Sequence, residues 1–143
     1  MNKSRLLGAV CASAFLFIFT SSKAAPVIDS FTGGSTFETF YGGSSGDVIG
    51  YSFIADVDLT VTDLGIINDP GDGALESAHL VGLWDATSQA LLGSVSVDSG
   101  DSLIDGFYYA TLAANNNLTA GMEYVLGALY TASHADSYLS NPT

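Results

Sequence analysis

Basic side chains are almost absent from this 143-residue chain. Fifteen Asp and Glu residues stand against only three basic ones, Lys3, Arg5 and Lys23, so no Lys or Arg follows position 23. A protein that binds the phosphates of nucleic acid needs clustered Lys or Arg to displace their counterions. Phosphate and carboxylate ligands are likewise held by Arg forks or by a P-loop lysine. The composition therefore excludes nucleic-acid binding through phosphate contacts and argues against an anion site built on basic side chains.

Cysteine is confined to Cys11, which lies in an apolar run near the start of the chain. There the sequence has the pattern of a secretory signal, with Lys3 and Arg5 before apolar residues 6–19 and a polar cluster after them. This run is shorter than the roughly 20 residues that a membrane-spanning helix needs. We expect cleavage after Ala24, which removes 24 of the 143 residues and leaves 119 with a formal charge of −15 and no cysteine. The exported protein then has no disulfide, thiolate metal site or cysteine nucleophile.

Apolar residues at helical spacing are also missing after residue 24. Instead, Val57, Leu59 and Val61 alternate with polar residues at the period of two that is typical of a half-buried strand. Further candidate strands are residues 49–53, 80–84, 91–97, 107–112 and 124–130. Clusters of Gly, Asp and Asn separate these segments, and the triplet of residues 115–117 predicts a turn. The pattern predicts an all-β fold, an antiparallel β-sandwich of the jelly-roll kind.

The chain divides into four parts by composition. Residues 1–24 are typical of a signal peptide, 25–46 of a Gly- and Ser-rich leader or edge strand, 47–130 of the β-sandwich domain, and 131–143 of a polar tail. Only this tail follows the last apolar segment, residues 122–130. We therefore expect that strand to lack a neighbour and to expose its backbone groups. The pattern favours a truncated tail and a self-associating protein.

Ordered motifs between residues 48 and 128 resemble a known bacterial domain. The motifs are GYSF at 50–53, VTDLG at 61–65, GDG at 71–73, His79, VGLWD at 81–85, LLGS at 91–94 and LTAGMEYVLGA at 118–128. This order is similar to that of an uncharacterised β-sandwich domain of PEP-CTERM proteins, which exosortases process and place at the cell surface or in extracellular polymer. The resemblance implies an exported bacterial protein, secreted or at the cell surface. Because the sequence as given has no sorting tail, the resemblance implies exosortase as a partner only if that tail is missing from this chain.

A glycine-containing loop is the candidate metal site. Its oxygen-bearing side chains are those of Asn68, Asp69, Asp72 and Glu76. Calcium takes about six to eight oxygen ligands, and carboxylates together with backbone carbonyls in such a loop supply that kind of shell. An ordinary solvated turn explains the same residues. Calcium is the only cofactor that the sequence suggests.

Two catalytic patterns are present in form but lie in an unfavourable context. The run GGSSG at residues 42–46 matches the G-x-S-x-G nucleophile elbow, yet a strand pattern follows it where the elbow needs a helix. The histidines are His79 and His134, and we interpret His79 as a hydrogen-bonding residue beside a loop rather than as a base. An extracellular hydrolase, glycosidase or esterase, stays the alternative function, with acids drawn from Asp69, Asp72, Glu76 and Asp85.

Aromatic rings support a binding function. An exposed ring beside acidic groups is a common platform for a sugar ring. Adjacent residues of a strand point to opposite faces, so Tyr108 lies opposite Phe107 and Tyr109. The lone Trp84 is more typical of a core, and both Tyr108 and Trp84 are candidate ligand-binding residues. The sequence therefore favours a secreted, non-enzymatic surface or matrix module that binds extracellular polysaccharide, with no membrane span after the signal.

Overall fold

The computed structural model describes residues 36–39, 46–71, 73–131 and 136–140, and these residues form strands and turns without a helix. The strands are β1 (Thr36–Thr39), β2 (Asp47–Ile54), β3 (Leu59–Ile67), β4 (His79–Asp85), β5 (Leu91–Val97), β6 (Ser102–Ile104), β7 (Phe107–Leu118), β8 (Glu123–Tyr130) and β9 (Ser137–Ser140). The predicted all-β class is confirmed. In the described part of the chain, accordingly, there is no helix of the length and apolar character needed to cross a membrane. The predicted signal peptide lies outside the described residues.

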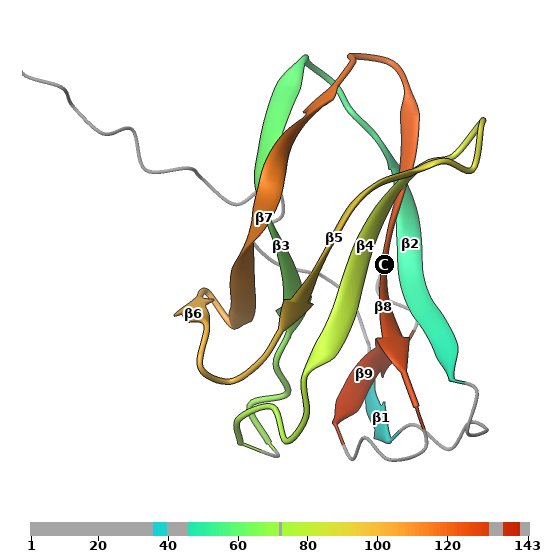
Figure 1. Ribbon diagram of the computed structural model, residues 1–143. Coiled ribbons are helices and arrows are strands. Elements are labelled where there is room, and N and C mark those ends of the chain that lie inside the picture. Colours follow the sequence, from blue (N-terminus) through green and yellow to red (C-terminus); the bar gives the residue numbers. More distant parts are fainter. Residues whose placement is uncertain (1–35, 40–45, 72, 132–135, 141–143) are drawn as a thin grey trace, which may run out of the picture.

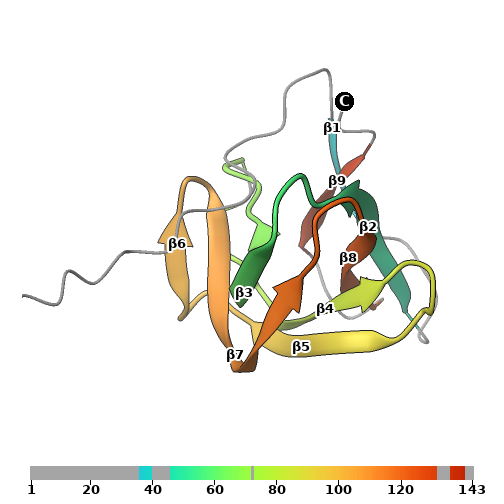
Figure 2. The same ribbon diagram turned by 90° about the horizontal axis from the view of Figure 1, so that it is seen from above.

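The strands pair into antiparallel sheets of four, three and two strands. The four-stranded sheet has the order β2-β8-β4-β5, the three-stranded sheet has the order β3-β7-β6, and β1 pairs with β9. Figures 1 and 2 show the two larger sheets side by side, with β5 close to β7. Buried side chains from both sheets form one hydrophobic cluster. The fold is therefore sandwich-like, whereas the jelly-roll arrangement stays a prediction.

The core follows from the alternation of apolar and polar or small residues along each strand. On β4, Val81 and Leu83 are buried between the sheets, and on β7 the inward positions are Tyr108, Ala110 and Leu112. Full burial of one such large apolar side chain stabilises the fold by about 1.5–3 kcal/mol. Successive residues of a strand point to opposite faces. The residues between these core positions are therefore placed on the outer faces of the sheets.

Strand β8 is not the unpaired strand that the sequence led us to expect. It pairs with β2 along its full length and also with β4, so it lies inside the four-stranded sheet. That expectation is wrong because β2, which comes much earlier in the chain, covers the exposed edge of β8. Such a long-range pairing leaves no trace in the local alternation of residues.

The predicted leader and tail each contribute a short strand. Within them, Thr36–Thr39 and Ser137–Ser140 pair as β1 and β9, an edge-strand arrangement of the kind considered for residues 25–46. The hydroxyl of Tyr138 donates a hydrogen bond to Oε2 of Glu38 across this pair, over 3.1 Å. The ring of Tyr138 also packs edge-on against Tyr130, with 6.0 Å between the ring centroids. The described part of the tail is thus attached to the end of β8.

The Asn triplet at residues 115–117 lies within β7 and does not form a turn. In the ladder, Val61 is opposite Asn116 and Thr60 is opposite Asn117. The hydroxyl of Thr60 donates a hydrogen bond to Oδ1 of Asn117 over 2.8 Å. Asn has low strand propensity, but pairing with β3 and this cross-strand hydrogen bond stabilise the extended form. The prediction of a turn was wrong here because the local preference is overridden by the neighbouring strand.

Candidate functional site

Three glycines lie in one row across the outer face of the four-stranded sheet. Gly50 on β2 is opposite Gly127 on β8, and Gly127 is opposite Gly82 on β4. A Cβ atom added at Gly127 would lie 2.6 Å from Cγ1 of Val48, and one added at Gly82 would lie 2.3 Å from Cη2 of Trp84. Such distances are far inside van der Waals contact. The glycines therefore provide a strip of bare backbone onto which neighbouring side chains fold.

The indole ring of Trp84 covers this strip. Val81 and Leu83 point into the core, so Trp84 and Gly82 share the outer face of β4. A Cβ at Gly82 would lie 2.3, 2.8 and 2.8 Å from Cη2, Cζ2 and Cζ3 of the ring, and one at Gly127 would lie 3.7 Å from Cζ3. Three adjacent ring atoms at similar distances indicate a ring that lies nearly flat on the sheet. Trp84 is partly exposed, so the interpretation of this residue as a core residue was wrong.

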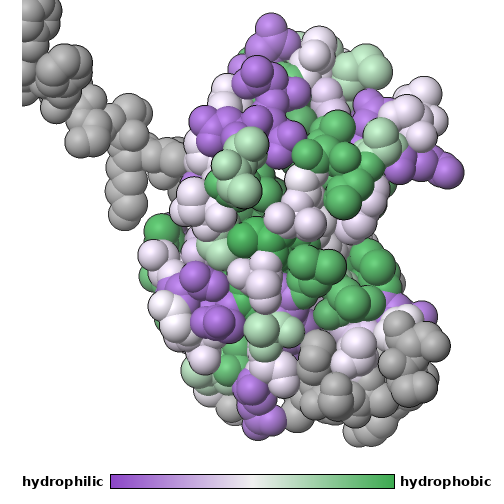
Figure 3. Space-filling model, viewed as in Figure 1, coloured by the Kyte–Doolittle hydropathy of each residue, from purple (hydrophilic) through white to green (hydrophobic). Residues whose placement is uncertain are grey.

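Exposed apolar side chains share the outer face of the sheet with the Trp84 ring. Leu91 on β5 is directly opposite Trp84 in the ladder, and Val48 and Leu80 lie on the same outer face. These three side chains are 54%, 58% and 51% exposed, respectively. Figure 3, which views the molecule from the side of β4 and β5, shows hydrophobic residues reaching the surface on that face. We call Trp84, Val48, Leu80, Leu91 and the glycine row of Gly50, Gly82 and Gly127 the Trp84 face.

A carboxylate borders the Trp84 face. Glu123 is exposed, and its ladder partner is Ile54. Val125, two residues along β8, is the ladder partner of Trp84. Glu123 therefore points to the same side of the sheet as Trp84 and is its diagonal neighbour in the ladder, at a backbone spacing of about 7–8 Å. The indole ring extends in the other direction along the strands, over Gly82 and Gly127. The ring and the exposed carboxylate thus share one surface, on opposite sides of the Trp84 backbone position.

Tyr108, the other candidate ligand-binding residue, lies in the core. Its side chain is 6% exposed and belongs to the cluster between the sheets. The expected alternation along β7 holds, because the rings of Phe107 and Tyr109 are neighbours on the opposite face, 6.0 Å apart. The inward direction of Tyr108 excludes it from a surface platform. Of the two candidates, the tyrosine is therefore buried and the tryptophan is partly exposed.

The loop between β3 and β4 contains the predicted calcium ligands. Nδ2 of Asn68 donates a hydrogen bond to the carbonyl of Gly73, and Oδ1 of Asp69 accepts one from the N–H of Gly71, each over 2.7 Å. The Glu76 side chain is exposed, and Asp72 lies outside the described residues. Among the residues that the structure describes, no group of three His, Cys, Asp or Glu side chains is arranged to hold a metal ion. Calcium binding stays a prediction.

Of the acids considered for the hydrolase, Asp85 lies at the turn between β4 and β5. Oδ1 of Asp85 accepts hydrogen bonds from the N–H and the hydroxyl of Ser88, each over 2.7 Å. These bonds, led by the one from the backbone N–H, lower the pKa of Asp85. Asp85 thereby closes the turn between β4 and β5. Ser44 and His134 lie outside the described residues, so the nucleophile elbow stays untested.

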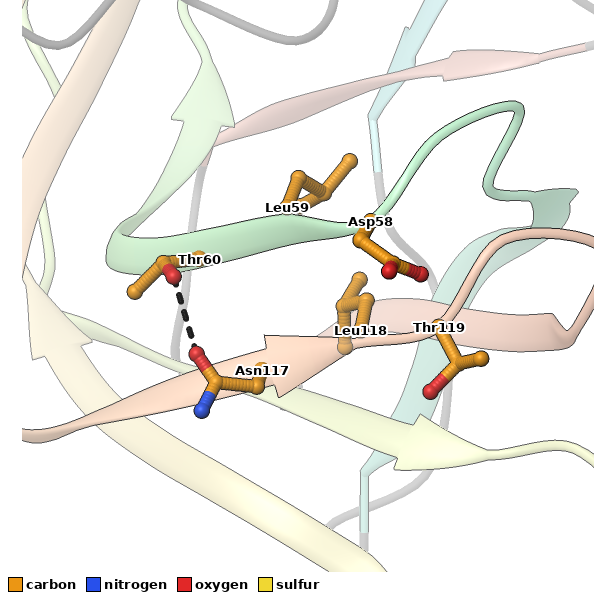
Figure 4. A pocket seen from close by; sticks show the side chains of 6 residues that line it. All are labelled: Asp58, Leu59, Thr60, Asn117, Leu118 and Thr119. Carbon is orange, nitrogen blue, oxygen red and sulfur yellow. Dashed lines mark hydrogen bonds between the residues drawn. The ribbon is translucent and has the colours of Figure 1, made fainter.

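An open depression lies where β3 begins and β7 ends. Its lining residues, drawn in Figure 4, are Asp58, Leu59, Thr60, Asn117, Leu118 and Thr119, and its volume is about 360 Å³. Thr60 and Asn117 bond to each other across it, and Oδ1 of Asp58 accepts a hydrogen bond from the N–H of Ala120 over 2.8 Å. Asp58 is the only carboxylate among the six lining residues. The depression thus lacks the pair of carboxylates that glycosidase chemistry uses.

Sequence reasoning missed the buried pair of His79 and Asp136. The sequence did indicate His79 as a hydrogen-bonding residue, but it placed Asp136 in a tail without pattern. Nε2 of His79 lies 3.0 Å from Oδ2 of Asp136, and neither side chain is accessible to a ligand. The pair therefore connects two segments of the fold and is not part of a surface site. Its only sequence signal is an acid within an otherwise uncharged tail.

No protein-family model matches the chain, and no curated protein or solved structure matches it either.

Proposed function

We propose that this protein is a secreted, non-enzymatic module of the cell surface or extracellular matrix that binds polysaccharide through the Trp84 face. The observation that carries the proposal is the flat position of the Trp84 ring over Gly82 and Gly127. An aromatic ring held in this way offers one face to the apolar face of a sugar ring. Because the glycines of the row have no side chains of their own, a long, flat polymer has room along the sheet.

The surroundings of Trp84 support binding more than catalysis. Leu91 and Val48 widen the apolar surface on both sides of the ring. Exposed apolar surface that gathers on one face is characteristic of interaction sites. Export agrees with the basic and apolar start of the chain and with the resemblance to proteins placed in extracellular polymer. The hydrolase alternative has weaker support, since Asp69 and Asp85 form hydrogen bonds within their own turns.

The test uses Trp84 as its own reporter, because it is the only tryptophan of the chain. We expect soluble polysaccharide to change the intensity and wavelength of its fluorescence with a saturable dependence on concentration. In affinity electrophoresis, Trp84→Ala should migrate without retardation. The matched control is Leu103→Ala, which removes an exposed apolar side chain from β6 in the other sheet and should leave binding unchanged.

Two results would overturn the proposal. If the same polysaccharides retard Trp84→Ala and the unaltered protein equally in affinity electrophoresis, the Trp84 face is not the binding surface. Turnover of chromogenic glycosides or esters, abolished by Asp72→Asn or Ser44→Ala, would favour the hydrolase. Far-UV circular dichroism of Trp84→Ala distinguishes lost binding from lost folding.

A further inference from the structure

We infer that the polysaccharide bound at the Trp84 face carries amines, as a polymer of partly deacetylated amino sugars does. This inference rests on the proposed function, because it names the chemical class of ligand for the same surface. Two observations carry it: the exposed Glu123 carboxylate on the same outer face of the sheet as the Trp84 ring, and the absence of any Lys or Arg after position 23. Together they make the surface complementary to a sugar with a positive charge.

The backbone of Glu123 is held in a definite position on the sheet. Its carbonyl accepts a hydrogen bond from the N–H of Ala86 over 3.1 Å, which attaches the start of β8 to the end of β4. The side chain is exposed and lies on the outer side of the sheet, diagonal to Trp84. A polymer that stacks one sugar on the indole and continues along β8 past Val125 brings the ammonium group of a neighbouring sugar within reach of the carboxylate. The electron-rich face of the indole attracts the ammonium group of the sugar that covers it.

The negative charge of the chain favours some ligands of the Trp84 face over others. All 15 acids lie after position 23, where no Lys or Arg opposes them. A polymer of uronic acids would be repelled, and no basic side chain is present to pair with its carboxylates. A second copy of the chain would bring the same charge and face the same repulsion. A polymer with amines is attracted, and its attraction weakens as salt screens the charges.

The experiment compares three β-1,4-linked hexamers that differ only in the group at C2 with one acidic hexamer. Glucosamine hexamer, N-acetylglucosamine hexamer and glucose hexamer (cellohexaose), together with galacturonic acid hexamer as an anionic ligand of different linkage, are titrated against the full chain, with Trp84 fluorescence as the readout. We expect the glucosamine hexamer to bind most tightly and the galacturonic acid hexamer not to bind. Glu123→Gln should weaken glucosamine hexamer binding by about 2- to 5-fold at low salt, the range of an exposed charge pair. The acetylated hexamer should bind Glu123→Gln and the unaltered protein equally.

Asp105→Asn is the matched control for the general effect of charge. Asp105 has φ 51° in the turn between β6 and β7, a conformation that Asn also adopts readily, and it belongs to the other sheet. This variant loses the same charge as Glu123→Gln and should bind the glucosamine hexamer as the unaltered protein does. Trp84→Leu keeps an apolar cover on the glycines but removes the ring. For Trp84→Leu we expect binding, followed by calorimetry, to be weaker by about 10-fold or more.

The outcomes separate the two proposals. If the acetylated and glucose hexamers bind as tightly as the glucosamine hexamer and Glu123→Gln has no effect, the amine inference is wrong and polysaccharide binding stands. If Glu123→Gln and Asp105→Asn weaken binding equally, the attraction is a property of net charge and the amine site is wrong. If no hexamer binds, or Trp84→Leu binds all of them unchanged, both proposals fail.

Discussion

Oδ2 of Asp136 lies 3.0 Å from Nε2 of His79, and the two residues are 3% and 0% exposed. The same carboxylate accepts hydrogen bonds from the N–H groups of Glu76 and Ser77, over 2.6 and 3.1 Å. Nδ1 of His79 lies 3.1 Å from the carbonyl oxygen of Leu129. The carboxylate thus connects the segment before β9 with the loop before β4, and the His79 ring that it contacts extends the connection to the end of β8.

Loss of this carboxylate should destabilise the whole fold. Asp136→Ala leaves two N–H groups and a ring nitrogen without their buried acceptor, and removal of one partner from a buried pair typically costs about 3–5 kcal/mol. Asp136→Asn keeps one acceptor oxygen and should cost less. Urea unfolding followed by circular dichroism measures both, with Asp105→Asn as an exposed control expected to stay within about 0.5 kcal/mol of the unaltered protein. Equal midpoints for Asp136→Ala and the control would show that the pair does not stabilise the fold.

Alkaline pH should weaken the fold through Tyr51. Burial, together with the nearby Tyr109 hydroxyl, raises the pKa of Tyr51 from 10.0 to about 12. Because this pKa is higher in the folded state, the folded protein keeps the phenol proton between these values while the unfolded chain loses it. The stabilisation is complete below pH 10 and is lost as pH rises toward 12, up to about 2–3 kcal/mol.

Unfolding experiments at pH 9 and at higher pH check this expectation against Tyr51→Phe. The phenylalanine variant has no phenol proton to lose at this position, so its stability should fall less between the two conditions. Tyr138→Phe serves as a comparison in the β1–β9 pair, where the hydrogen bond from the Tyr138 hydroxyl to Glu38 also raises the pKa of Tyr138. An identical alkaline loss in Tyr51→Phe and the unaltered protein would assign the effect to other tyrosines.

The sequence predicts features that depend on near neighbours, and it fails where distant strands decide. The alternation of Val81 and Leu83 with Gly82 is local, so the β4 strand was predictable from its residues. The face on which Trp84 lies depends on the direction of the strand relative to the second sheet, which one strand by itself does not reveal. The partner of His79 is 57 positions away, and no periodicity connects them. The sequence therefore predicted that Trp84 is a candidate ligand-binding residue, but it did not predict the face of the sheet on which Trp84 lies.

Calcium should stabilise the protein more than sodium at equal ionic strength. The loop that contains Asp69 and Glu76 lies in a strongly acidic chain, and a bound divalent cation would reduce the repulsion while ordering the loop. At a calcium concentration about 100 times the dissociation constant, the gain is about 2.7 kcal/mol, which raises the melting temperature by several degrees. The double variant Asp69→Asn/Asp72→Asn should lose this response, and the matched pair Asp98→Asn/Asp101→Asn in the turn before β6 should keep it. Superimposable melting curves in the two salts would contradict the prediction that the protein binds calcium.

A methyl group at Gly82 should lift the Trp84 ring without breaking the sheet. The atom that a Cβ would meet there, Cη2 of Trp84 at 2.3 Å, is the far end of a side chain, whereas at Gly50 it is the backbone oxygen of Leu126 at 2.0 Å. A side chain can rotate away, but a paired strand cannot, so Gly82→Ala should fold and Gly50→Ala should be severely destabilised. With its ring displaced from the backbone, Trp84 in Gly82→Ala should be quenched more strongly by acrylamide and should bind polysaccharide more weakly.

A double-mutant cycle decides whether Gly82 acts through the ring. In Gly82→Ala the methyl group removes the packing of the indole on the sheet, and in Trp84→Leu there is no indole left to displace. The loss of stability caused by Gly82→Ala should therefore shrink in the Trp84→Leu background, with a coupling of about 0.5–3 kcal/mol, as expected for residues in contact. Strictly additive effects, together with unchanged acrylamide quenching in Gly82→Ala, would mean that the ring does not rest on this glycine. The flat aromatic surface, on which both functional proposals depend, would then have to be abandoned.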